Sequence, residues 1–136
     1  MPSDLSGTWK LIRGESDFGF LPPPRLRVDM ITHREPYLHM RTRQKDANGD
    51  IVLDRNVTIG GAAEQIVIRG RARLLRAFWE EQTLVVETTS EVSGSARRIE
   101  DRWTVDADGA WLTIERAHDQ PGGTVHQWLR LRRIES

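Results

Sequence analysis

The sequence predicts an all-β protein, folded as a single antiparallel up-and-down β-barrel of roughly 8–10 strands. Glycine and proline interrupt the chain at short intervals, and the stretches between them alternate apolar and polar residues with a period of two. No longer window favours the helical period of about 3.6 residues. A meander of short strands leaves exposed edges unless it closes on itself, so a barrel is favoured over a sandwich.

Consecutive segments of the chain carry the strand pattern. In the first of them Trp9 and Leu11 share a face, and in the second Leu26, Val28 and Met30 do so. The last four segments are joined by short turns and form the clearest part of the meander. The predicted strands cover residues 8–13, 26–32, 37–44, 51–59, 65–69, 71–79, 84–92, 97–105, 111–118 and 124–133.

Two connections between these segments are predicted to be tight turns. Residues 46–50 contain the strongest turn signal, because Asn48 and Gly49 readily adopt the positive φ angles that tight hairpins require. Residues 33–36 end in proline and predict a hairpin between the second and third strands.

The loop Phe18–Pro24 has a different composition. It contains three consecutive prolines, which cannot donate to a β-ladder, beside the apolar residues Phe18, Phe20 and Leu21. We expect this loop to act as a flap over one opening of the barrel.

The composition excludes several classes of partner. The 136 residues suit one domain, covering 1–136, and the 20 acidic residues balance the 20 basic ones. With no net positive charge, we expect neither nucleic acid nor a membrane as a partner. The absence of cysteine excludes disulfides and thiolate metal sites. The N-terminal segment lacks the basic and apolar regions of a secretory leader, so we expect a cytoplasmic location. We also expect a monomer or a homodimer.

The opening segment resembles the first strand of the calycin superfamily, in which lipocalins and fatty-acid-binding proteins begin with Gly-x-Trp. Gly7 and Trp9 match that motif, and the Asp-Gly and Asn-Gly turns are similar to those of the fatty-acid-binding branch. The resemblance implies a calycin-like barrel in which Trp9 seals one end. It also implies that an arginine of the last strand, Arg130 or Arg132, packs across that tryptophan.

The sequence departs from the fatty-acid-binding pattern in two places. Residues 14–25 are too short and too rich in proline for the two lid helices of that branch, and the last strand lacks its Arg-x-Tyr pair. The chain is also similar to small bacterial lipocalin-like proteins. The resemblance therefore implies binding of a small molecule rather than of a fatty acid as such.

Polar residues that share a strand face with apolar ones are the candidate binding residues, because such a face points into the barrel. They predict a small, largely apolar ligand with a polar or anionic group. On the last strand, the face opposite His126 and Trp128 carries Val125, Leu129 and Leu131. It is equally apolar, so the sequence leaves open which of the two faces is buried. An ion pair of Asp101 with Arg116 is an alternative, purely structural role for both. The candidates are Met30, Met40, Arg55, Arg76, Asp101, Trp103, Arg116, His126 and Trp128.

An enzyme is the alternative hypothesis. Asp101 with His126, or with His118, is a candidate acid–base pair for a cofactor-independent cyclase or isomerase that folds a reactive substrate inside the barrel. We expect no cofactor and no metal, since His33 and His39 lack a third ligand at the usual spacing. A third class, an adaptor or subunit, predicts a filled interior and an exposed apolar patch.

Overall fold

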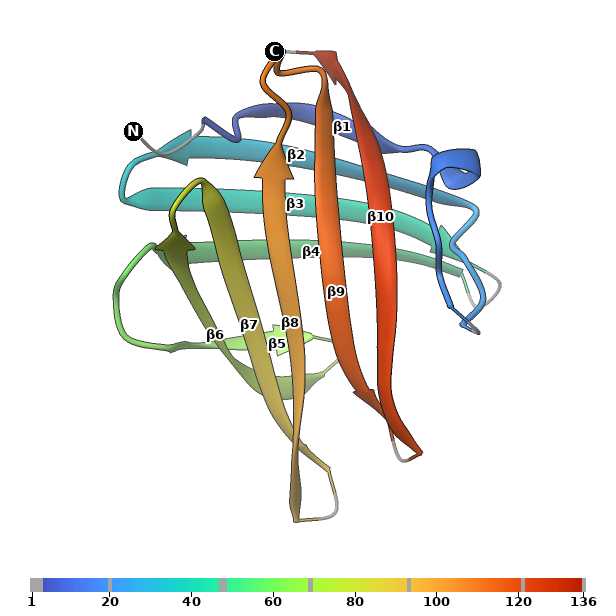
Figure 1. The fold of residues 1–136 in the computed structure, drawn as a ribbon. Helices are drawn as coiled ribbons and strands as arrows, with labels where there is room; N and C mark the ends of the chain where they lie inside the picture. The colour runs from blue at the N-terminus through green and yellow to red at the C-terminus, as the bar shows by residue number, and fades with distance from the viewer. Residues whose placement is uncertain are drawn as a thin grey trace.

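The computed structural model describes residues 4–19, 21–46, 49–68, 70–92, 94–120 and 122–135. These residues form a single antiparallel sheet of ten strands and one short 3-10 helix, η1 (Arg13–Glu15), which confirms the all-β prediction (Figure 1). No helix in this part of the chain is long and apolar enough to cross a membrane. The strands are β1 (Gly7–Leu11), β2 (Leu26–Arg34), β3 (Tyr37–Asp46), β4 (Gly49–Thr58), β5 (Glu64–Ile68), β6 (Arg71–Glu80), β7 (Thr83–Val92), β8 (Ser95–Val105), β9 (Trp111–Gln120) and β10 (Gly123–Glu135).

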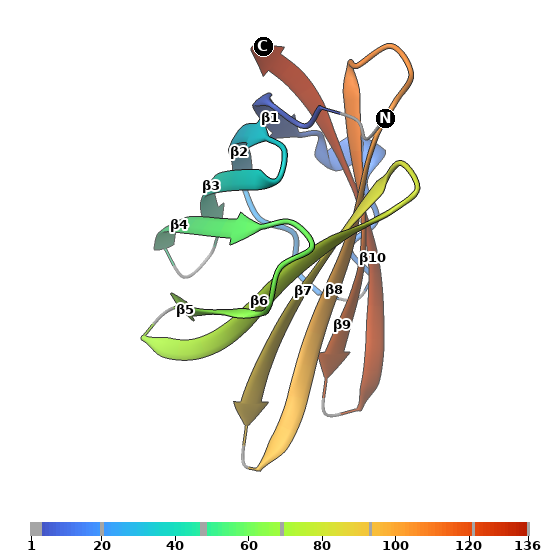
Figure 2. The ribbon, with the colours of Figure 1, turned by 90° about the vertical axis from the view of Figure 1, so that its left-hand side faces the viewer.

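The sheet curls into a nearly closed barrel. Strand β1 pairs with both β2 and β10, so the strand order is β4-β3-β2-β1-β10-β9-β8-β7-β6-β5. The two edge strands, β4 and β5, face one another without a hydrogen-bonded ladder between them (Figure 2). At one end of this opening the amide of Gly60 donates to the carbonyl of Ala77, 2.8 Å away. The predicted closure of the meander is therefore confirmed, with one interruption.

The apolar core fills one half of the barrel. It is built from alternate residues of the strands, because every second side chain of a strand points to the same face. Two fully buried tryptophans, Trp9 and Trp103, are its largest members. The other core side chains include Leu5, Leu11, Ile31, Leu38, Met40, Val57, Leu75, Ala77, Leu84, Val86, Leu112, Ile114, Leu129 and Leu131.

Strand β2 turns its polar face into the barrel, against the prediction for Met30. Arg27 and Asp29 are buried, whereas Met30 is 44% exposed on the outer surface. The register explains the difference, since Ile31 lies opposite Met40 of β3 and Asp29 lies opposite Trp9 of β1. Directly opposed residues of a sheet share a face, so these two pairs direct Ile31 and Asp29 inward.

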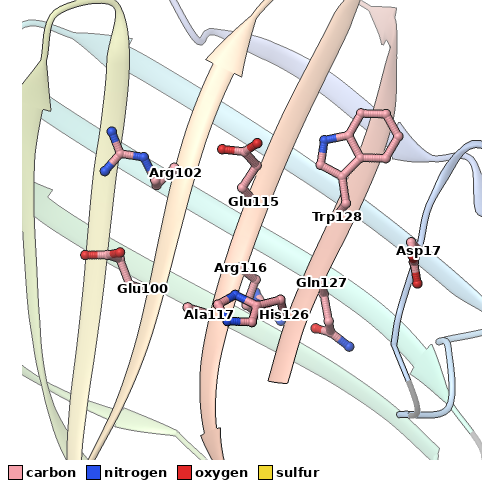
Figure 3. A pocket seen from close by; sticks show the side chains of 9 residues that line it. All are labelled: Asp17, Glu100, Arg102, Glu115, Arg116, Ala117, His126, Gln127 and Trp128. Carbon is pink, nitrogen blue, oxygen red and sulfur yellow. The ribbon is translucent and has the colours of Figure 1, made fainter. Parts of the chain in front are cut away.

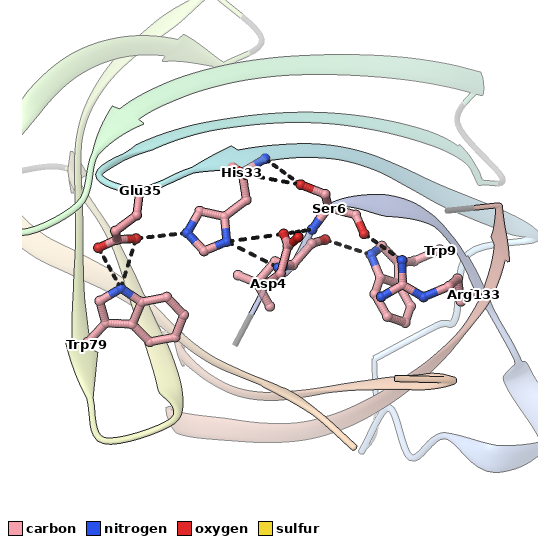
Figure 4. Close-up of polar contacts among 8 residues, drawn as sticks. Asp4, Ser6, Trp9, His33, Glu35, Trp79 and Arg133 are labelled. Atoms are coloured by element: carbon pink, nitrogen blue, oxygen red, sulfur yellow. Dashed lines mark hydrogen bonds and ion pairs between the residues drawn. The ribbon is translucent and has the colours of Figure 1, made fainter. Parts of the chain in front are cut away.

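Trp9 seals one end of the barrel as the resemblance implied, but the arginine that covers it is Arg133. The Arg133 guanidinium lies 4.2 Å from the centre of the Trp9 ring and donates to the carbonyl of Ser6 at 2.6 Å (Figure 4). It also donates to the carbonyl of Gly109 at 2.8 Å. Arg130 and Arg132 stack instead on Trp111. A register shift of β1 between Thr8 and Trp9 places Trp9 opposite Arg133.

His33 ties the N-terminal segment to the sealed end. The amide of Leu5 donates to His33 Nδ1 at 3.1 Å, and His33 Nε2 contacts Glu35 at 2.8 Å (Figure 4). The carboxylate of Glu35 also accepts a hydrogen bond from the indole of Trp79, on β6. Because Nδ1 accepts the hydrogen bond from the Leu5 amide, the ring proton lies on Nε2, which can donate to Glu35.

The predicted loops lie where expected, within the described residues. Gly49 has a φ of 115°, which glycine adopts freely, and its predicted turn partner Asn48 lies outside the described residues. In the loop Phe18–Pro24, Phe18 packs against the core, and Phe20 lies outside the described residues. The preceding residue, Asp17, forms an isolated bridge with Trp128 of β10. That the loop moves as a flap stays a prediction.

Candidate functional site

The second half of the barrel contains a cavity of about 290 Å³. Side chains from β2 through β9 line it, which places it inside the barrel rather than on its surface. Its apolar wall consists of Ile51, Leu53, Ile68 and Ile99. Its polar wall consists of Arg27, Thr42, Gln44, Arg55, Arg73, Thr88, Asp101 and Arg116.

One polar cluster surrounds the fully buried carboxylate of Asp29. Arg27 Nε donates to Asp29 Oδ2 at 2.9 Å, and the hydroxyl of Thr42 donates to Oδ1. Arg55 Nη2 in turn donates to Thr42 Oγ1 at 3.2 Å. The chain of hydrogen bonds joins β2, β3 and β4 and balances the charge of Arg27 with that of Asp29.

A second pair joins the opposite wall of the cavity. Arg116 donates two hydrogen bonds to Asp101, from Nε to Oδ1 at 2.8 Å and from Nη2 to Oδ2 at 3.0 Å. Burial opposes ionisation of Asp101, but the charge and hydrogen bonds of Arg116 outweigh it and hold the pKa of this carboxyl below its usual value. The Asp101–Arg116 ion pair, which the sequence suggested as an alternative structural role for both residues, is therefore present.

Arg55 and Arg73 lack such partners. Among the described residues, no carboxylate lies within ion-pair distance of either guanidinium, and the Nε atom of each is buried without a hydrogen-bond partner. Burial lowers the pKa of Arg55 to about 10, against the opposing influence of the Asp29 charge. Arg55 therefore remains charged at neutral pH although it is buried.

Five of the nine candidate binding residues point into the barrel. Arg55, Asp101 and Arg116 line the cavity, whereas Met40 and Trp103 are fully buried in the core and do not border the cavity. Whether any of them binds a ligand stays a prediction.

The other four candidates lie on the outer surface, so their expected position in the cavity is wrong. They are Met30, Arg76, His126 and Trp128. Arg76 forms an ion pair with Glu87, and Trp128 is 43% exposed. In β6 and β10 the alternate residues point inward, since Leu75, Ala77, Leu129 and Leu131 are buried.

The acid–base pair of Asp101 with His126 does not form. Asp101 is buried and lines the cavity inside the barrel. His126 is exposed on the outer face (Figure 3). His126 instead borders an open groove on the outer face of β8–β10, beside Glu100, Glu115 and Trp128. His118 has a hydrogen bond to Gln120, and burial, together with the charge of Arg116, lowers its pKa.

Several cavity residues were not among the candidates. The missed residues that line the cavity include Arg27, Thr42, Arg73 and Thr88. Asp29, which accepts a hydrogen bond from Arg27, was also missed. The sequence did contain a signal that identifies the inward face of β2. A two-residue turn at Glu35 and Pro36 pairs Met40 with Ile31 and Thr42 with Asp29, so an inward Met40 implies an inward Asp29.

Comparison with solved structures identifies the fold. A secretory abundant heat soluble protein from Ramazzottius varieornatus superposes with a TM-score of 0.74 at 12% identity, covering 98% of this chain and 97% of that one. Human cRBP IV gives a TM-score of 0.64 at 18% identity, covering 97% and 99%. Zebrafish ileal bile acid-binding protein, solved with cholic acid, gives 0.67 at 12% identity, covering 97% and 100%.

No protein-family model matches the sequence, and no curated protein sequence matches it. The structural similarities extend over nearly the whole chain, so the protein has a calycin-like fold, as predicted. Within that class it has the ten-stranded form with one unpaired opening between β4 and β5.

Proposed function

We propose that the barrel binds a compact, largely apolar small molecule, with the polar group of that molecule directed at the polar wall of the cavity. The observation that carries this proposal is a cavity within the barrel whose lining combines isoleucine and leucine side chains with four arginines, two of them paired with carboxylates. Pockets for small molecules are mostly apolar with a few placed polar groups.

The size of the cavity supports a compact occupant. Its volume of about 290 Å³ lies near the lower end of the range for small-molecule pockets, because the two tryptophans and their neighbours fill the other half of the barrel. Similar barrels include a bile acid-binding protein and a fatty acid transporter, which supports an apolar ligand inside this architecture.

Titration with prodan, a neutral environment-sensitive fluorophore, tests the proposal. We expect saturable binding to one site and a blue-shifted emission. Leu53→Trp fills the cavity and is expected to weaken binding by about tenfold or more, because the apolar volume available to the probe is lost. Leu74→Trp is the matched control, since Leu74 is half-exposed on the outer face.

Two outcomes contradict the proposal. One is the absence of saturable binding, and the other is equal binding by both tryptophan variants, which would place the probe outside the barrel. Native mass spectrometry of freshly purified protein then identifies the class of any retained molecule, as an adduct that disappears on denaturation.

The remaining expectations about partners and location stay proposals. They are a cytoplasmic location, a monomeric or homodimeric state, and the lack of nucleic-acid or membrane partners. Cell fractionation, sedimentation and binding assays with DNA and vesicles test them directly.

A further inference from the structure

The polar wall of the cavity carries more positive than negative charge. Four arginines line it, namely Arg27, Arg55, Arg73 and Arg116. Two carboxylates, Asp29 and Asp101, balance Arg27 and Arg116 through direct hydrogen bonds. Among the described residues, no carboxylate forms a direct ion pair with Arg55 or Arg73, so the four arginines exceed the two carboxylates of the site by two charges.

Both of these arginines also keep an unused hydrogen-bond donor. Arg55 is only 6% exposed and donates to Thr42 through Nη2, but its Nε has no acceptor, and the buried Nε of Arg73 has none either. A buried donor without an acceptor is unfavourable, and more so when the group is charged. The arrangement is therefore complementary to an anion with several acceptor oxygens.

The two arginines lie on strands that flank the opening in the sheet. Arg55 belongs to β4 and Arg73 to β6, on either side of the opening in the sheet, and Thr88 of β7 adds a buried hydroxyl to the same cavity. The inward residues of β10 contribute no cation there, since Val125, Leu129 and Leu131 are apolar and Arg133 covers Trp9.

We propose that the ligand carries a doubly charged anionic group, such as a phosphate monoester, which binds between Arg55 and Arg73. This inference rests on the proposed function, because it names the polar group of the same ligand. Two guanidinium groups match the charge of a dianion, and their N–H groups match its oxygens in pairs. The isoleucine and leucine side chains then contact the apolar part of the ligand.

Competition against bound prodan tests the inference with three ligands of equal chain length, octyl phosphate, octanoate and octanol. At pH 7.5 we expect octyl phosphate to bind about tenfold or more tightly than octanol, with octanoate between them. The advantage of octyl phosphate is expected to shrink towards pH 5, because a phosphate monoester loses its second charge near pH 6.

Arg55→Met and Arg73→Met are expected to abolish the advantage of octyl phosphate while octanol binding persists. Arg76→Met is the matched control, since Arg76 lies on the outer face of the same strand as Arg73. It is expected to leave all three affinities unchanged. Retained prodan binding in each variant shows that the barrel is folded.

The outcomes separate the two proposals. Equal affinities for the three ligands overturn the anion site but leave the proposed function intact. Equal affinities for octanoate and octyl phosphate overturn the doubly charged group. A failure of prodan and all three ligands to bind overturns the proposed function itself.

Discussion

Asp29 lies directly opposite Trp9 across the β1–β2 pair, and both side chains are completely buried. The boundary between the apolar core and the polar cavity wall therefore runs between two neighbouring residues. Trp9 seals the end of the barrel under Arg133, whereas Asp29 anchors Arg27 and Thr42. A carboxylate in this position is stable only because its oxygens accept these hydrogen bonds.

Asp29→Asn is expected to lower the free energy of unfolding by about 3 kcal/mol, because it leaves the buried guanidinium of Arg27 without its counter-charge. Urea denaturation at pH 7 measures the change. Asp50→Asn, at an exposed position of β4, serves as the control and is expected to shift stability by less than about 0.5 kcal/mol. Equal effects of the two substitutions would show that the Asp29 cluster does not stabilise the fold.

The Asp101–Arg116 pair is expected to make stability depend on acid pH. The folded-state pKa of Asp101 lies below the unfolded value of about 3.9, so the unfolded chain takes up the proton first. The contribution of Asp101 is therefore complete above about pH 4 and is lost as the pH falls through the folded-state pKa.

Asp101→Asn is expected to destabilise the protein by about 3 kcal/mol at pH 6, because Arg116 loses its partner. The difference from the unmodified protein is expected to shrink as the pH falls below about 4 towards the folded-state pKa of Asp101. Urea midpoints measured across this range provide the test. A difference that stays constant with pH would contradict the assignment.

Arg133→Met is expected to destabilise the barrel by about 2 kcal/mol, since it removes the contact with the Trp9 ring and the hydrogen bonds to Ser6 and Gly109. Arg132→Met, on the neighbouring outward position, is expected to have a smaller effect. Thermal unfolding followed by tryptophan fluorescence compares the two variants. A larger effect at Arg132 would favour Arg132, one of the two arginines expected from the sequence to cover Trp9.

The two methionines of the predicted site provide a matched pair for the inward and outward faces. Met40→Ala is expected to cost about 2–5 kcal/mol, because Met40 is fully buried and its loss leaves a cavity. Met30→Ala is expected to cost less than about 0.5 kcal/mol at its exposed position. Chemical denaturation of both variants measures the difference. Similar losses would mean that β2 does not present its polar face to the interior.

Much of the fold was predictable because its signals are local. The period-two alternation and the turn residues located the strands, and Gly7 with Trp9 indicated the sealed end. The candidate site was predicted less completely. Arg55, Asp101 and Arg116 were placed correctly in the cavity, but Arg27 and Asp29 were missed because Leu26, Val28 and Met30 formed a more apolar face on the same strand.

By itself, the sequence determined that this protein is a single β-barrel of short antiparallel strands with charged residues among its apolar ones. Only the tertiary structure decided which face of each strand points inward, and hence that Arg133 covers Trp9 and that Arg55 and Arg73 face a cavity. The reason is physical, since a shift of one residue in strand pairing exchanges the two faces. That register depends on contacts between strands distant in the sequence, such as β1 with β10.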